Sequence, residues 1–287
     1  MISIDIVLHV EGNYKSASSL ISEIYKQAKV SIGSFIVVLT SKHTDEEERF
    51  KEFCKKNDVF LFEIEDWYFS SSLTIQRAIR HYAKGDIVVV LNQKIRLLGS
   101  GSLYNLVKDI ESKKCAFTYG RQVIKHNNLE KYLLNELFPT SPILISKDDF
   151  KIIKQEVFPA LTMFYALDRN VFLKLDGYQN YEHLLEANTF YMKKLVDNGY
   201  ILRYCSEALA ENPFRLHHRQ VYDCYYYLGK FLLEKDNMFL YEDYRKRKMG
   251  RVLASRLARH LKFIGVIRIF LYNFTKQRAR HKVNKLR

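Results

Sequence analysis

Short apolar runs alternate with segments of helical periodicity along the first half of the chain. The runs are typical of β-strands, and they lie at Ile2–Val10, Phe35–Leu39, Val59–Ile64 and Ile87–Leu91. Strands that alternate with helices predict right-handed βαβ units and a mostly parallel sheet. Ligands of such sheets bind beyond the carboxyl ends of the strands. Candidate chemistry is therefore expected just after these runs.

Helical segments are predicted between the strands. Apolar residues recur at helical spacing between Leu20 and Ala28 and between Leu73 and Ala83, and Gly85 supplies a helix stop after the second segment. Thr44 and Glu47 form a capping box, which predicts a helix that begins there and runs through Lys55.

The second half of the chain is less regular. It predicts extended segments at Cys115–Tyr119 and Tyr200–Cys205, and helices at Arg169–Leu175, Glu182–Asn198 and Arg219–Leu233. No linker divides the chain before about residue 235, which predicts one domain over residues 1–235 and a tail over residues 236–287.

Charge is concentrated in that tail. The 287 residues carry a net charge of +14, yet 15 of the 46 Lys and Arg residues fall between Arg245 and Arg287, where no Asp or Glu occurs. The preceding residues carry 31 basic and 32 acidic side chains. A localised anionic partner is therefore expected, and a nucleic acid bound by the whole protein is disfavoured.

The tail also carries an apolar stripe at helical spacing. Leu253, Leu257, Leu261, Ile264 and Ile267 continue into Leu271 and Phe274, while Arg259 and Lys262 fall away from this stripe. A basic amphipathic helix of this kind is typical of an anionic membrane surface. The alternative is that the stripe packs on the protein's own domain and the charges are solvated. No apolar run reaches the roughly 18 residues that a membrane span needs, and no signal peptide is recognised.

Other motif searches exclude several classes. The sequence contains no GxxxxGK[ST] loop, no GxSxG elbow and no HExxH motif, and its four Cys form no CxxC pair. Dispersed cysteines argue against a disulfide framework or a zinc ribbon and fit a reducing compartment.

Several phrases resemble one enzyme family. The most specific is Tyr119-Gly120-Arg121-Gln122, and it is joined by Ala83-Lys84-Gly85-Asp86, Arg169-Asn170-Val171-Phe172, Asp176-Gly177-Tyr178 and Asn198-Gly199-Tyr200. Together they resemble family 2 glycosyltransferases, most closely the bacterial rhamnosyltransferase-like branch, over roughly residues 1–235. The resemblance implies a GT-A-like (Rossmann-like) α/β fold, with a mostly parallel sheet flanked by helices and the basic helical tail added at the C-terminus.

The family resemblance also implies a reaction and its partners. Such enzymes transfer a sugar from a nucleotide donor, here expected to be of the dTDP or UDP type, to a lipid-linked or growing glycan. On that basis we place Tyr119, Arg121 and Gln122 on the acceptor side. The expected setting is bacterial cell-surface polysaccharide assembly at the inner face of the cell membrane, with other glycosyltransferases as further candidate partners.

The residues of the family's active site are replaced in this chain. Thr40 and Gln76 stand where the family has nucleotide-binding Asp and Arg, and Asn92-Gln93-Lys94 stands where it has its acidic metal motif. Ala187-Asn188 replaces an acidic pair, with Glu186 one residue earlier, and Asn212-Pro213-Phe214 replaces a His-x-His segment. The resemblance makes Mg²⁺ or Mn²⁺ possible, but their ligands are not recognisable and no cofactor is expected.

Three interpretations follow from these replacements. In an active transferase, Thr40, Gln76, Asn92 and Gln93 would contact the nucleotide, Lys94 would bind the diphosphate in place of a cation, and Glu186 would be the base. Alternatively, the chain is an inactive relative that serves as a scaffold for active transferases, with Lys94 and Glu186 as ordinary surface residues. The third interpretation retains only the fold and leaves the function open.

Overall fold

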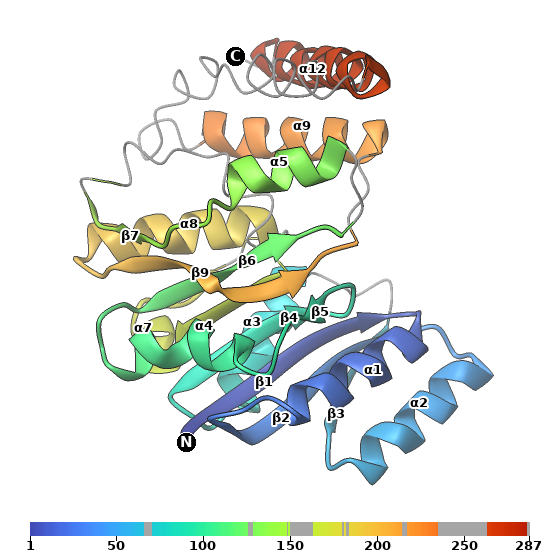
Figure 1. The fold of residues 1–287 in the computed structure, drawn as a ribbon, viewed down its shortest axis with the longest axis vertical. Coiled ribbons are helices and arrows are strands. Elements are labelled where there is room, and N and C mark those ends of the chain that lie inside the picture. The colour runs from blue at the N-terminus through green and yellow to red at the C-terminus, as the bar shows by residue number, and fades with distance from the viewer. Residues whose placement is uncertain are drawn as a thin grey trace.

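A computed structural model of the chain describes residues 1–65, 71–125, 129–147, 149, 163–179, 181, 184–213, 217–234 and 263–285. Its centre is a mixed sheet, in which the described strands follow the order β3-β2-β1-β4-β8-β6-β9-β5, with β7 paired to β9 (Figure 1). The strands are β1 (Ile2–Glu11), β2 (Val30–Ser41), β3 (Phe60–Glu65), β4 (Ile87–Asn92), β5 (Arg96–Leu97), β6 (Phe117–Val123), β7 (Ile143–Ile145), β8 (Phe164–Asp168) and β9 (Leu202–Glu211).

Four parallel strands form the half of the sheet that the sequence predicts best. Strand β1 pairs in parallel with both β2 and β4, and β2 pairs in parallel with β3. The register places Glu11 beside Thr40 and His9 beside Asn92. The carboxyl ends of β1, β2 and β4 therefore lie together at one edge of the sheet.

Strand β8 makes the rest of the sheet mixed. It lies between β4 and β6 and is antiparallel to both, and every one of its residues is buried. Because β8 is antiparallel to both of its neighbours, β6 runs parallel to β4 and its carboxyl end lies at the same edge of the sheet. The predicted α/β fold is confirmed, and its sheet is more mixed than expected.

Helices cover both faces of the sheet with separate hydrophobic cores. Helices α1 (Tyr14–Tyr25), α2 (Asp45–Lys56) and α4 (Ser102–Glu111) pack on one face. The opposite face carries α3 (Ser71–His81), α5 (Leu129–Leu137), α7 (Arg169–Lys174) and α8 (Leu184–Asp197). Alternation of side chains along β1 feeds both cores, because Ile6 and Leu8 point to the first and Val7 to the second.

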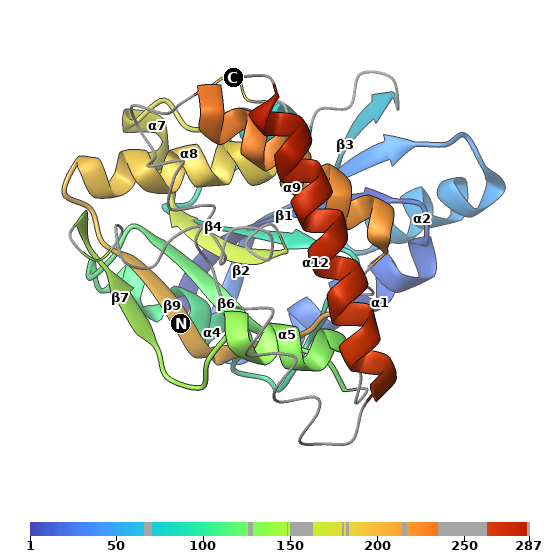
Figure 2. The ribbon, with the colours of Figure 1, turned by 90° about the horizontal axis from the view of Figure 1, so that it is seen from above.

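The last described helices form an outer layer on the second face. Helix α12 (Phe263–Asn284) lies over α9 (His218–Glu234), as both views show (Figures 1 and 2). The contacts His218–Thr275, Tyr226–Lys282 and Gly229–Val283 follow the same order along both helices, so the helices run in the same direction. None of the described helices combines the length and hydrophobicity that crossing a bilayer requires. The division between residues 1–235 and a tail stays a prediction.

Candidate nucleotide and acceptor site

The carboxyl ends of β1, β2 and β4 bring together the predicted nucleotide-binding residues Thr40, Asn92 and Gln93. Thr40 at the end of β2 is buried, and its Oγ1 lies 3.2 Å from Nε2 of His9 on β1. Asn92 ends β4 beside His9, and its Oδ1 accepts a hydrogen bond from the Lys94 backbone N–H at 3.0 Å. Sequence reasoning expected chemistry at the end of β1 but did not single out His9, which is a polar residue directly after a buried apolar run.

Burial gives His9 an unusual charge state. Loss of solvent lowers the pKa of His9 from 6.5 to about 4; Glu11 opposes this shift, and the positive charge of Lys94 adds to it. The imidazole is therefore neutral at pH 7. The same electrostatic coupling indicates that the Lys94 ammonium lies near His9.

Gln93 joins the ends of β4 and β1. Its side-chain amide is buried, accepts a hydrogen bond from the Glu11 N–H at 3.2 Å and donates one to the Glu11 carbonyl at 2.8 Å. Both ends of the amide are thus used in holding the backbone. Lys94 is exposed next to this clamp, so its position is set by a rigid turn.

An ion pair also lies at this edge of the sheet. Lys42, just after β2, pairs with the Glu11 carboxylate at 3.4 Å, and both side chains are partly exposed. Neither residue was predicted, because the signal lies in the strand register and not in a motif. The edge therefore presents the exposed Lys94 and the neutral His9 beside the pair of Lys42 and Glu11.

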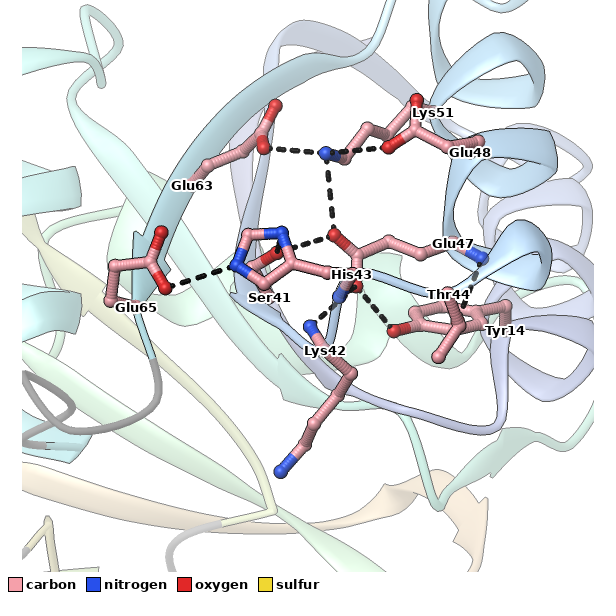
Figure 3. A network of polar contacts seen from close by, with 10 residues as sticks. All are labelled: Tyr14, Ser41, Lys42, His43, Thr44, Glu47, Glu48, Lys51, Glu63 and Glu65. Atoms are coloured by element: carbon pink, nitrogen blue, oxygen red, sulfur yellow. Dashed lines mark hydrogen bonds and ion pairs between the residues drawn. The ribbon is translucent and has the colours of Figure 1, made fainter.

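The turn that carries Lys42 is held by a buried carboxylate, Glu47 of α2 (Figure 3). Glu47 accepts hydrogen bonds from the Tyr14 hydroxyl at 2.8 Å, the Ser41 hydroxyl at 2.6 Å and the Lys42 N–H at 2.6 Å. Burial alone would raise the pKa of Glu47, but these hydrogen bonds outweigh it and lower the pKa to about 2.

Helix capping and ion pairing complete this network. The Glu47 N–H donates to Thr44 Oγ1 at 3.3 Å, which confirms Thr44 as the predicted helix cap. Lys51 pairs with Glu47 at 3.3 Å and with Glu63 of β3 at 2.7 Å. The network therefore ties β2, β3 and α2 together next to the carboxyl end of β2.

Gln76 lies apart from this edge. It stands on α3, where its Oε1 accepts the Tyr178 N–H at 2.6 Å and its Nε2 donates to the Gln179 carbonyl at 3.4 Å. The amide holds the turn after α7. Its predicted contact with the nucleotide stays a prediction.

The predicted acceptor-side residues follow one another along β6. Tyr119 is buried against Tyr204, with ring centroids 5.2 Å apart, and burial raises the pKa of Tyr119. Gln122 is buried and accepts a hydrogen bond from Asn212 Nδ2 at 2.7 Å. Arg121 is partly buried, and among the described residues its Nε has no hydrogen-bond partner.

The start of α8 carries the candidate base. Ala187 and Asn188, at the positions of the family's acidic pair, are both buried. Glu186 lies in the first turn of α8, and its side chain is outside the described set. Among the predicted membrane residues, Leu253, Leu257, Arg259, Leu261 and Lys262 lie outside the described residues, as does the side chain of Ile264.

The described residues at this edge do not form a divalent-cation site. The end of β4 offers amide groups and the ammonium of Lys94, whereas Mg²⁺ and Mn²⁺ prefer carboxylate oxygens. Glu11 is paired with Lys42. Throughout the part of the chain that the structure describes, no group of three or more His, Cys, Asp or Glu residues is placed to share a metal ion.

The architecture is that of GT-A glycosyltransferases. The structure superposes on a mannosyltransferase from Pyrobaculum calidifontis, solved with GDP-Man and Mn²⁺, over 98% of this chain and 85% of that one, with a TM-score of 0.61 and 15% identity. Staphylococcus aureus TarS, solved with UDP-GlcNAc, matches over 91% of this chain and 73% of its own, with a TM-score of 0.55 and 11% identity. These likenesses confirm the predicted fold.

The chain is also similar in sequence to two O-antigen chain rhamnosyltransferases. The O-antigen chain rhamnosyltransferase WbaN of Salmonella anatum is 25% identical over 208 residues, which cover 71% of this chain and 64% of WbaN. RfbN of Salmonella typhimurium, of the same name, is 26% identical over 177 residues, covering 61% of this chain and 56% of RfbN. The chain thus spans less than two thirds of these relatives. No protein-family model matches it.

Proposed function

We propose that this protein transfers a sugar from a nucleotide donor to a lipid-linked or growing glycan, in the assembly of an O-antigen type polysaccharide. The observation that carries this proposal is the clustering of Thr40, Asn92 and Lys94 at one sheet edge. Nucleotides bind at this edge in open α/β sheets. The names of the two rhamnosyltransferases and the nucleotide sugars bound by the two structural neighbours support the same activity.

Electrostatics at this edge favour a diphosphate group. Lys94 is exposed on a turn that Gln93 fixes, so its ammonium can reach a phosphate oxygen without reorganising the backbone. His9 is neutral at pH 7 and adds hydrogen-bonding capacity without charge. Lys94 would thus offset the negative charge that develops on the departing diphosphate.

The transfer step needs a base and an orienting group. The acceptor hydroxyl oxygen would form a bond to the anomeric carbon of the donor sugar while the bond from that carbon to the diphosphate oxygen breaks. Glu186, at the start of α8, would receive the hydroxyl proton. Arg121, a partly buried residue on β6, would orient the acceptor or its phosphate through its guanidinium group.

This acceptor implies a place for the enzyme. A lipid-linked glycan is held at a membrane, so the protein would act as a peripheral enzyme at the inner face of the cell membrane. The sequence resemblance leads us to expect a nucleotide-sugar donor of the dTDP or UDP type.

Calorimetry of the full chain tests the donor side directly. UDP, dTDP and GDP are titrated with EDTA present and with Mg²⁺ or Mn²⁺ present. We expect one of the three to bind in EDTA, because Lys94 takes the place of the cation. Absence of binding by all three under every condition would rule out the transferase.

An inactive scaffold is the second candidate function. It is favoured by the burial of Ala187 and Asn188, which removes both positions of the family's acidic pair from the solvent. Such a protein would form a stable complex with a neighbouring glycosyltransferase. Purification from its native host as a single monomeric species would argue against the scaffold.

A further inference from the structure

Helix α12 presents four large apolar side chains to solvent. Ile267, Phe270, Leu271 and Phe274 are 60%, 65%, 50% and 66% exposed. Their spacing of three and four residues places them on one face of the helix. Three of them, Ile267, Leu271 and Phe274, belong to the stripe predicted from the sequence. An apolar row of this kind on a protein surface marks an interaction site.

The outward face becomes basic toward the C-terminal end of the helix. Arg278, His281, Lys282 and Lys285 are exposed at the next turns of α12, and Lys282 lies over the ring of Tyr226. Helix α12 contains no Asp or Glu. The same helix therefore offers an apolar surface followed by a positively charged one.

The opposite face of α12 is already occupied by the protein. Ile269, Ala279 and Val283 are buried. Helix α12 packs on α9 and also contacts α5. Lys276 lies over the ring of Tyr225 with its Nζ 4.4 Å from the centroid. One face of α12 therefore packs against the rest of the protein. The exposed apolar residues lie on a different face of the same helix.

We propose that the outward face of α12 docks on an anionic lipid bilayer. Ile267, Phe270, Leu271 and Phe274 would enter the boundary between headgroups and acyl chains, and the basic side chains would bind lipid phosphates. Charge decides between possible occupants, because an uncharged apolar partner would leave the basic half of the face unmatched. A bilayer surface also matches the straight, outermost position of α12 (Figure 2).

This orientation places the membrane on the acceptor side of the site. Arg268 pairs at 2.8 Å with Glu130, a buried residue in the first turn of α5. Helix α5 follows the carboxyl end of β6, where Arg121 and Gln122 lie. The Arg268–Glu130 pair therefore links the apolar half of α12 to α5, the helix that follows β6 in the chain. Only this last link rests on the proposed transferase function.

Vesicle flotation of the full chain tests the docking face. The probes are vesicles of phosphatidylcholine alone and of phosphatidylcholine with phosphatidylglycerol, at low and high salt. Phe270→Ser combined with Phe274→Ser removes the apolar contact, and Leu144→Ser, at an apolar residue 53% exposed on β7, is the matched control. Arg278→Gln combined with Lys285→Gln removes charge, with Lys55→Gln and Lys56→Gln on α2 as the control.

We expect the wild type to bind the anionic vesicles and the Phe270/Phe274 variant to lose at least tenfold in affinity. Each basic residue removed should weaken binding at low salt about fivefold, which corresponds to about 1 kcal/mol, and the controls should bind like the wild type. Equal flotation of the Phe270/Phe274 variant and the Leu144 control, or no binding by the wild type, would overturn the proposal. The proposal would also be overturned if the Phe270/Phe274 variant kept its vesicle affinity but changed its oligomeric state. The exposed face would then be an interface with another copy of the chain. Calorimetry with UDP and dTDP should be unaltered in all α12 variants, so failure of docking and failure of the transferase are separate results.

Discussion

His9 joins three strand ends and is the residue whose charge state the fold alters most clearly at this edge. Its neutral form is favoured in the folded protein, because burial lowers its pKa from 6.5 to about 4. Protonation therefore favours the unfolded chain. The stabilisation is fully present above about pH 6.5 and is lost as the pH falls toward 4.

We expect the imidazole resonances of His9 to titrate by NMR with a midpoint near pH 4. Lys94→Gln should move this midpoint upward, because it removes a nearby positive charge that opposes protonation. His9→Gln, which keeps a hydrogen-bonding group next to Thr40, identifies the resonances and serves as the control. A midpoint near pH 6.5 in the wild type would contradict the burial of His9.

Glu47 is a capping residue in the sequence and a structural anchor in the protein. Its carboxylate holds the N–H groups of Lys42 and His43 as well as two hydroxyls. We expect Glu47→Gln to lower the free energy of unfolding by about 3 kcal/mol at pH 7, because a buried ion pair loses one partner. Urea unfolding measures this change, and Glu46→Gln, at an exposed neighbour in the same turn, is the matched control.

The pH dependence separates this role from simple packing. Since the folded-state pKa of Glu47 is lowered from 4.5 to about 2, its contribution is present above about pH 4.5 and is lost as the pH falls toward 2. The difference between the wild type and Glu47→Gln should narrow over that interval. A difference that stays constant from pH 7 to pH 2 would contradict an ionised Glu47.

At the scale of elements, the close approach of β6, β8 and β9 depends on one glycine. A Cβ atom at Gly120 would lie 2.3 Å from the Phe164 ring on β8 and 2.9 Å from the Ala208 carbonyl oxygen on β9. We expect Gly120→Ala to lower the free energy of unfolding by about 2–3 kcal/mol through overpacking. Gly101→Ala, whose Cβ would meet nothing closer than 3.8 Å, is the control in the same urea titration. Equal stabilities of the two variants would refute this account of the tyrosine-glycine-arginine-glutamine phrase.

Predictability of the elements follows from how local their signals are. Strands β1 and β4 begin at the predicted residues, and each extends one residue further. They were predictable because consecutive residues are buried on both faces, which gives the apolar runs Ile6–Leu8 and Ile87–Leu91. Strand β2 begins at Val30, five residues before the predicted Phe35, because its first half is only partly buried and less apolar. Strand β8 was not predicted, although Phe164–Asp168 is fully buried. Its antiparallel insertion between β4 and β6 depends on pairing across the chain, which no local pattern encodes.

At the scale of the whole molecule, the sequence was more informative about the place of the site than about its residues. The alternation of strands and helices implied that chemistry lies just after the strands, and Thr40 and Asn92 do lie beside the same histidine. The roles of Glu11 and Lys42 depend on register between β1 and β2, and the clamp by Gln93 depends on side-chain geometry. Asp5 shows the same limit, since it accepts the N–H groups of Lys84 and Gly85 from 79 and 80 residues away.

The proposed contact between Lys94 and the diphosphate can be tested by nucleotide binding. If this lysine replaces a cation, then its contribution concerns the phosphates and not the base or ribose of the nucleotide. We expect Lys94→Gln to weaken UDP or dTDP binding at least tenfold, since a hydrogen bond to a charged group contributes about 1.5–3 kcal/mol. The affinity for the corresponding nucleoside, uridine or thymidine, should stay unchanged.

Calorimetry of the wild type, Lys94→Gln and the control Lys56→Gln makes the comparison, each in EDTA and in Mn²⁺. Because Gln93 holds the turn through backbone contacts, the substitution at the exposed neighbouring position should leave the site's shape intact. A parallel loss of nucleoside affinity would show instead that the turn had moved. Full retention of diphosphate affinity would show that Lys94 is an ordinary surface lysine and would contradict its proposed contact with the diphosphate.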